Sequence, residues 1–279
     1  MAPDRRREGA VVTFVTRDYE DKVEILAMNR PERRNALGQD MLRDLLESVS
    51  RAANDKDVNV ILLAGNGPGF SAGADLKDFS AGDINDTFDL NRRLGAFVRS
   101  LALVRKPVIC AVDGFALGGG FMLAVSCDVV VTAPLARWHL PEVSLGWLPG
   151  FGLDTLAARV GPFAARSLSW SPTPIDGVEA HRLGLADIQS LPTETAREAS
   201  LRYAKGLAAM PPHAVLTTKQ FFSTSVTARA EVMDDLANRY FAQDILHETA
   251  RANMQRFLPK KTAAPSLRVH EQRVFPPKE

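Results

Sequence analysis

The stretch Asp113–Asp128, DGFALGGGFMLAVSCD, places three consecutive glycines at the start of an apolar run with helical spacing. A glycine inside a helix costs roughly 0.5–1 kcal/mol relative to alanine. Gly118, Gly119 and Gly120 therefore indicate that bare backbone is required at this point. The requirement could be a tight turn, close packing, or main-chain N–H groups that hold a ligand.

A second segment, AGNGPGFSAGADLKDF at residues 64–79, has the same design. An apolar strand leads through a glycine-bearing turn into a helix that we expect to begin near Ala74 and Asp75. The first N–H groups of a helix have no partner inside it, and the helix dipole favours negative charge there. Two such helix ends facing one another would offer two N–H groups to one oxygen, which is an oxyanion hole.

Other glycine-dependent sites fit the sequence less well. A dinucleotide fingerprint beginning at Gly118 fails because Leu123 stands where the third glycine belongs, and no lysine follows either turn as a phosphate loop requires. GFSAG at residues 69–73 does match the G-x-S-x-G pattern of serine hydrolases, with Ser71 as nucleophile. However, an NGPG turn separates Ser71 from the strand, and the downstream histidines fit only by their order. A small residue in a tight loop is the competing interpretation of Ser71.

The pattern of apolar residues predicts an α/β fold. Strands are expected at residues 11–16, 23–29, 58–65, 107–114 and 128–133, and several are apolar without alternation, as strands buried on both faces are. Amphipathic helices are expected at 37–53 and 87–104, and after about residue 192 only helices follow. We therefore expect a flexible N-terminus at 1–10, a core at 11–199, a helical region at 200–258 that also serves oligomerisation, and a peripheral tail at 259–279.

Composition excludes several classes of function. The chain has 279 residues, and 34 Lys and Arg balance 33 Asp and Glu, so no basic field is present for nucleic acid. Two cysteines, Cys110 and Cys127, cannot form a disulfide framework and fit a reducing compartment. No stretch approaches the roughly 20 apolar residues of a membrane span. We expect a cytoplasmic protein that binds neither nucleic acid nor membranes.

Glu142 is the carboxylate that stands out, in RWHLPEVSLGWLPGFG at residues 137–152. It follows Pro141 in an otherwise apolar segment, and a carboxyl group in such surroundings tends to have a raised pKa, which suits proton transfer near neutral pH. The alternative is that Glu142 simply begins a helix, where acidic residues are common. Taken alone, Glu142 favours the second interpretation.

Four motifs together resemble the crotonase superfamily, also called the enoyl-CoA hydratase/isomerase family. They are NRPERRNAL (29–37), FSAGADLK (70–77), GFALGGG with the following CD (114–128), and PEVSLGWLPGFG (141–152), in that order. The resemblance covers roughly residues 11–258. It implies a crotonase-like spiral of ββα units with a C-terminal helical region, assembled as a homotrimer or homohexamer.

The resemblance also implies a site. Ala74 and Gly119 would give the two oxyanion N–H groups to the thioester oxygen of an acyl-CoA, and Glu142 would act as acid and base. Contacts to coenzyme A, which is part of the substrate, would fall at Arg33, Ala36, Ala72, Asp75, Leu76 and Lys77. No bound cofactor is expected, and the sequence has no metal-ligand cluster.

Met122 departs from the family pattern. The two-glutamate hydratases carry their first glutamate at this position, and a thioether cannot transfer protons. A single carboxylate suits a 1,3-proton shift, so isomerisation of an enoyl-CoA is favoured. The alternatives are hydration by Glu142 alone or with Asp154, and a non-catalytic scaffold that binds CoA esters. Aromatic side chains hint at an apolar acyl pocket, although core packing explains each of them equally well: Phe121, Trp138, Trp147 and Phe151.

Overall fold

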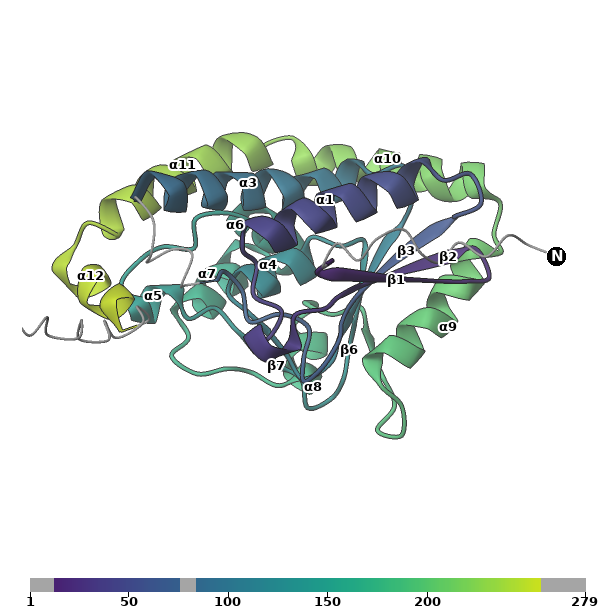
Figure 1. Ribbon diagram of the computed structural model, residues 1–279, viewed down its shortest axis with the longest axis horizontal. Coiled ribbons are helices and arrows are strands. Elements are labelled where there is room, and N and C mark those ends of the chain that lie inside the picture. The colour runs from purple at the N-terminus through teal and green to yellow at the C-terminus, as the bar shows by residue number, and fades with distance from the viewer. Residues whose placement is uncertain (1–12, 76–83, 257–279) are drawn as a thin grey trace, which may run out of the picture.

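The apolar segments pair into a six-stranded sheet in the computed structural model, which describes residues 13–75 and 84–256 (Figure 1). The strand order is β1-β2-β3-β4-β6-β8, in which β1 runs antiparallel to β2 and the other neighbours are parallel. A second, parallel sheet holds β5 and β7. The bounds are β1 Val15–Glu20, β2 Val23–Met28, β3 Val60–Gly65, β4 Val108–Val112, β5 Phe115–Leu117, β6 Val129–Thr132, β7 Arg137–His139 and β8 Ile188–Gln189.

Helices cover both faces of the large sheet. Their bounds are η1 Pro31–Arg33, α1 Gln39–Asn54, α3 Ile84–Leu103, α4 Gly119–Val125, α5 Glu142–Leu145, α6 Leu153–Val160, α7 Pro162–Trp170, α8 Gly177–Arg182, α9 Ala196–Ala208, α10 Pro212–Thr227, α11 Ala230–Asp244 and α12 Glu248–Gln255. Figure 1 shows α1, α3 and α11 along one side of the molecule and α9 on the other. This arrangement confirms the α/β class and the crotonase-like fold that the sequence predicts.

The strands lack apolar alternation because both faces of the sheet are buried. On β3, Ile61 and Leu63 belong to the cluster that contains the apolar faces of α1 and α3. Their neighbours Val60 and Leu62 belong to a second cluster, which α9 closes with its alanines. Successive strand residues point to opposite faces, so each face receives an apolar layer.

The first strand lies later in the chain than predicted. Strands at 23–29, 58–65, 107–114 and 128–133 correspond to β2, β3, β4 and β6, but β1 is Val15–Glu20 rather than residues 11–16. It is an edge strand in which residues 17–20 are exposed and mostly polar, so a search for apolar runs does not find it. Asp21 and Lys22 join it to β2 with positive φ angles of 47° and 64°, as a tight hairpin turn requires.

The C-terminal helices pack on different parts of the core. Helix α9 packs on the large sheet. The predicted boundary between residues 199 and 200 therefore falls within this helix. Helices α10 and α11 pack against α3, and α12 packs against the short α5 (Figure 1). Within residues 13–75 and 84–256, no helix has the length and apolar character to cross a bilayer.

Two glycine substitutions test how tightly the α4 segment is packed. A Cβ added at Gly120 would lie 2.6 Å from the main-chain oxygen of Ser71, whereas nothing lies within 4 Å of one added at Gly206 in α9. Gly120→Ala should therefore lower the free energy of unfolding by about 1–3 kcal/mol. Gly206→Ala should raise it by about 0.5–1 kcal/mol, because alanine is the better helix former. Urea denaturation measures both, and equal effects of the two substitutions would contradict the packing described.

Candidate active site

The two glycine-bearing segments lie against each other. Gly73 has a φ of +87°, and a Cβ added there would stand 2.6 Å from the oxygen of Leu117 and 2.9 Å from the nitrogen of Gly119. A Cβ added at Gly119 would stand 3.5 Å from the nitrogen of Ala74. The main-chain nitrogens of Ala74 and Gly119 are therefore neighbours, and glycine is required for the segments to approach so closely.

Both of these nitrogens are placed to bind a ligand. Ala74 forms a bridge with Leu37, in which the Leu37 N–H donates to Gly73 O and the Asp75 N–H donates to Leu37 O, so the Ala74 N–H is left out of the bridge. Gly119 is the first residue of α4, where an N–H has no helical acceptor. In the described parts of the chain neither N–H donates a hydrogen bond, and both residues line one cavity. One oxygen could accept from both.

The structure describes only one of the two predicted helix starts. Gly119 does begin a helix, as expected, but Ala74 and Asp75 are not helical, and the residues that follow them lie outside the described ranges. At Ala74 a bridge to Leu37 leaves this N–H without a main-chain acceptor among the described residues. The sequence pattern did not reveal the bridge because its two partners are far apart in the chain.

Ser71 supports the loop from inside. Its side chain is fully buried, its Oγ donates to Asn35 O at 2.8 Å, and the same oxygen accepts from the Gly73 N–H at 3.2 Å. Asn35, which the sequence analysis missed, donates through Nδ2 to the carbonyls of Asn66, Gly69 and Phe70. Ser71 does not line the cavity. This arrangement fits the small residue in a tight loop and not the nucleophile of a serine hydrolase.

Glu142 places a carboxyl group in the same cavity. It is the first residue of α5, as one interpretation expects, and its carboxyl oxygen Oε2 is buried in a mostly apolar cavity, as the other expects. A Cβ added at Gly118 would lie 2.7 Å from Oε1, and Oε2 is buried without a hydrogen-bond partner among the described residues. Burial raises the pKa of Glu142 to about 7, and a hydrogen bond from its own N–H offsets only part of this effect. Such a group can take up and release a proton near neutral pH.

The cavity is small and mostly apolar, with a volume of about 70 Å³. Of the described residues that line it, Glu142 is the only one with an ionisable side chain. The lining is formed by Ala72, Ala74, Asn91, Gly118, Gly119, Met122, Pro141, Glu142, Leu145, Trp147, Pro149, Gly150, Phe151 and Phe241. Two of the four aromatic residues singled out in the sequence, Trp147 and Phe151, therefore line the pocket. The other two, Phe121 and Trp138, stack edge to face in the core at 5.4 Å.

Met122 lies where the sequence placed it, on α4 three residues after Gly119. It is buried and lines the cavity, and its sulfur packs against Gly152, where an added Cβ would meet Sδ at 3.1 Å. The cavity therefore brings together a carboxylate, two neighbouring N–H groups and a thioether. This set can stabilise negative charge on an oxygen while one group moves a proton.

Comparison with known proteins places the chain in a family. Residues 18–264 match the family described as Enoyl-CoA hydratase/isomerase. A relative from Mycobacterium leprae, named a probable enoyl-CoA hydratase, is 35% identical over 236 residues, 83% of this chain and 85% of the relative. The 2,3-dehydroadipyl-CoA hydratase of Escherichia coli strain K12 is 33% identical over 249 residues, 87% of this chain and 94% of that protein. The crystal structure of an enoyl-CoA hydratase/isomerase from Mycobacterium paratuberculosis superposes with a TM-score of 0.79 at 26% identity, covering 88% of this chain and 98% of that one.

The chain belongs to the enoyl-CoA hydratase/isomerase family. The family match spans all four motifs, from residue 29 to residue 152, that the sequence analysis used. In this enoyl-CoA hydratase/isomerase family member, Asp154 does not line the cavity with Glu142. Its carboxylate pairs with Arg229 at 3.0 Å instead.

The residues predicted to contact coenzyme A come from two segments, at residues 33–36 and 72–77, and the structure describes four of the six. Arg33 ends η1 and is partly exposed, and Ala36 is buried with its N–H donating to Arg33 O. Ala72 lines the cavity, and Asp75 is buried and pairs with Arg30 at 3.1 Å. Leu76 and Lys77 lie outside the described residues.

The C-terminal helices complete the site, which the sequence analysis did not foresee. Phe241 of α11 lines the cavity, and Asp244 accepts from the Leu148 N–H at 2.9 Å. Asn253 of α12 donates to Leu145 O at 3.0 Å, so α12 holds the end of α5. These contacts join residues about 100 positions apart, and no local pattern signals them.

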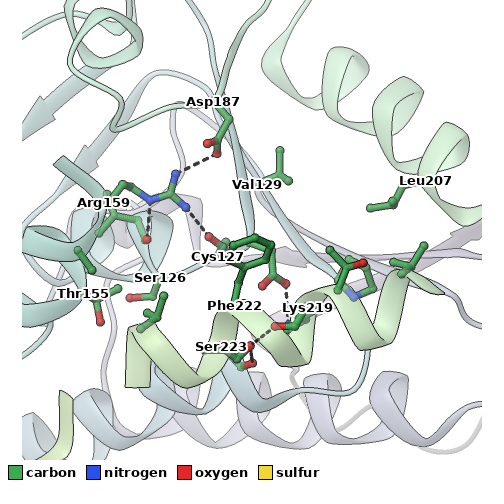
Figure 2. Close-up of a pocket in the computed structure, with 18 of the residues that line it drawn as sticks. Ser126, Cys127, Val129, Thr155, Arg159, Asp187, Leu207, Lys219, Phe222 and Ser223 are labelled. Carbon is green, nitrogen blue, oxygen red and sulfur yellow. Dashed lines mark hydrogen bonds and ion pairs between the residues drawn. The ribbon is translucent and has the colours of Figure 1, made fainter. Parts of the chain in front are cut away.

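A second, larger cavity of about 510 Å³ lies between α10 and β6, away from Glu142 (Figure 2). Its charged side chains are already paired. Arg159 binds Asp187 and the Cys127 carbonyl, and Lys219 binds Asp128 at 2.6 Å. It contains none of the predicted site residues. Across the described residues, no group of three His, Cys, Asp or Glu side chains is arranged to hold a metal ion.

The raised pKa of Glu142 predicts a pH-dependent effect of Glu142→Gln on stability. Because the folded pKa of about 7 lies above the usual 4.5, the folded protein holds this proton more tightly than the unfolded chain. The charged carboxylate therefore destabilises the native protein as the pH rises through this interval. Glutamine does not titrate, so the stability of the variant relative to the native protein should increase by on the order of 3 kcal/mol.

Urea denaturation of the native protein and Glu142→Gln at about pH 5 and about pH 8 measures this change. Other groups titrate equally in both proteins and cancel in the difference. A difference in unfolding free energy that is the same at both pH values would contradict the buried, proton-holding carboxyl group.

Proposed function

We propose that this protein acts on an acyl-CoA thioester and moves the carbon–carbon double bond of an enoyl-CoA. Glu142 acts as the single acid and base, and the N–H groups of Ala74 and Gly119 hold the thioester oxygen. The observation that carries the proposal is that one carboxylate, with a pKa of about 7, lies in the cavity beside these two N–H groups.

The geometry accounts for each step of a 1,3-proton shift. The Glu142 carboxylate removes a proton from C2 of a 3-enoyl thioester, and the electrons move onto the thioester oxygen to give a dienolate. The Ala74 and Gly119 N–H groups stabilise this oxyanion, and each donor of this kind is typically worth about 2.7–4 kcal/mol. The protonated Glu142 then returns the proton at C4, which gives the 2-enoyl thioester. No other proton carrier or bound cofactor takes part.

Coenzyme A is bound, in this proposal, along the two segments at residues 33–36 and 72–77. Arg33, Ala36, Ala72, Asp75, Leu76 and Lys77 are the proposed contacts, as the family resemblance implies. The Arg30–Asp75 ion pair fixes the loop next to Ala74 and so supports a binding surface there. The position of Ala72 in the cavity wall supports passage of the thioester arm beside it.

Hydration of a 2-enoyl-CoA is the second candidate. The two relatives described above are named hydratases, which favours it. Hydration by two carboxylates would require a partner for Glu142, but Met122 is a thioether and Asp154 pairs with Arg229 outside the cavity. Hydration would therefore depend on Glu142 alone. A non-catalytic CoA-ester scaffold is less well supported, because a buried carboxyl group with a pKa near 7 costs stability that binding alone does not require.

Assembly and location remain predictions. A homotrimer or homohexamer is supported by large apolar side chains that are exposed on α10 and α11, among them Phe221, Phe222 and Val232. A cytoplasmic location is expected from the two unpaired cysteines, Cys110 and Cys127.

Glu142→Gln should abolish isomerisation of a short 3-enoyl-CoA, with a loss of at least about 10³-fold in kcat, because the amide keeps the shape but carries no transferable proton. Asp154→Asn is the matched control and should retain nearly native turnover, since Asp154 lies outside the cavity. Formation of the conjugated thioester, followed by its absorbance, measures both. Isomerisation that survives in Glu142→Gln would remove Glu142 from the mechanism.

Met122→Glu tests the choice between isomerisation and hydration. The native protein should hydrate a 2-enoyl-CoA poorly, since it lacks a second carboxylate to orient water. Met122→Glu should raise hydration by at least about tenfold, provided that the new carboxyl group is paired or neutral in the apolar pocket. Loss of the conjugated absorbance reports hydration, with Met122→Gln as the control for size and polarity. Rapid hydration by the native protein would change the proposed reaction to hydration.

A further inference from the structure

Asn91 brings an amide group into the wall of the cavity that holds Glu142. It lies on α3, is only 4% exposed, and packs on Gly150, where an added Cβ would lie 2.1 Å from Nδ2. Apart from Glu142 and the Trp147 indole, the described side chains of this wall are apolar. A buried amide in such a wall costs free energy unless its polar atoms find partners.

A chain of hydrogen bonds fixes the orientation of this amide. Asn238 of α11 binds the main-chain oxygen of Asp234 at 2.9 Å, and because a carbonyl only accepts, the Asn238 atom must be Nδ2. Its Oδ1 is therefore the atom that faces Asn91 at 2.7 Å, and Asn91 must present Nδ2 to it. The acceptor Oδ1 of Asn91 is left for a ligand, and no donor in residues 13–75 and 84–256 reaches it.

The residues behind this chain of hydrogen bonds are themselves held by hydrogen bonds and an ion pair. Asp234 is buried, accepts from the Gly152 N–H at 2.9 Å, and pairs with Arg99 of α3 at 2.5 Å. Both helices and the loop that ends at Gly152 are thus tied together behind Asn91. An acceptor held in this way loses little conformational entropy when a ligand binds, so it can discriminate between ligands.

We infer that Asn91 is a specificity-determining residue whose Oδ1 accepts a hydrogen bond from a hydroxyl group near the end of a short acyl chain. The inference rests on the proposed function, because it takes the cavity to be the acyl pocket. A site built to bind a hydroxyl group rejects an analogue that lacks it, since the analogue leaves a buried acceptor unpaired. The substrate class is therefore a short, hydroxylated acyl-CoA.

The size of the cavity limits the length of the acyl chain. The volume of about 70 Å³ is only a few times the roughly 10–15 Å³ that a cavity needs to hold one water, so only a short acyl chain fits. The thioester carbonyl, held by Ala74 and Gly119, takes part of this space. C4 carries the double bond and takes up the proton in the proposed reaction, so the hydroxyl group that meets Asn91 lies at C5.

Binding of saturated acyl-CoA thioesters tests the inference by titration calorimetry. The probes are 5-hydroxypentanoyl-CoA and hexanoyl-CoA, which differ by a hydroxyl group in place of a methyl group, and 4-hydroxybutanoyl-CoA and pentanoyl-CoA as a shorter pair. The native protein should bind the better hydroxylated probe about tenfold more tightly than its methyl counterpart. Asn91→Leu, which keeps a similar shape without polar atoms, should abolish or reverse this preference.

Asn54→Leu makes the same chemical change at an exposed residue at the end of α1 and should retain the native preference. If Asn91→Leu does not fold, the relative affinity of the native protein for the hydroxylated and methyl probes tests the inference by itself. Equal or tighter binding of the methyl probes by the native protein, or an unchanged preference in Asn91→Leu, would overturn the inference. These probes carry no double bond, so failure here is distinct from failure of the isomerisation assay with Glu142→Gln.

Discussion

The close approach of the Gly73–Ala74 segment to the Gly118–Gly119 segment is the constraint on which the rest of the site depends. Side chains on Gly73 or Gly118 would collide with the opposite backbone or with the Glu142 carboxylate. The approach is held from behind by Ser71, whose main-chain oxygen accepts from the Leu117 N–H at 3.0 Å. The glycines therefore cost helix propensity but allow two N–H groups to meet at one point.

The raised pKa of the Glu142 carboxyl group is a consequence of the apolar cavity around it. Trp147, Phe151 and Phe241 exclude water from Glu142, and this burial is what raises its pKa to about 7. The same walls leave Glu142 without a second carboxylate, because Met122 fills the neighbouring position. The buried carboxyl group costs stability at neutral pH, and the proposed proton transfer would make use of its raised pKa.

Motifs that are local in sequence predicted their part of the site well. Ala74, Gly119, Glu142 and Met122 all line the cavity, since each lies within a short segment whose glycine, proline and apolar pattern fixes its own backbone. Ala74 itself is not helical, because a bridge to Leu37 sets its backbone, and the residues in which the predicted helix would continue lie outside the described ranges. Asn35 was missed because its three carbonyl partners lie more than 30 residues away.

The sequence by itself determined the α/β class, the family and the segments that line the candidate site, because strand and helix periodicity and glycine-bearing turns act over a few residues. Only the tertiary structure decided the walls of the pocket. Phe241 and the Asn91–Asn238 pair come from α3 and α11, whose contact joins residues almost 150 positions apart. Such contacts depend on how amphipathic helices pack on the finished core, and many other sequences would present an equivalent apolar face to it.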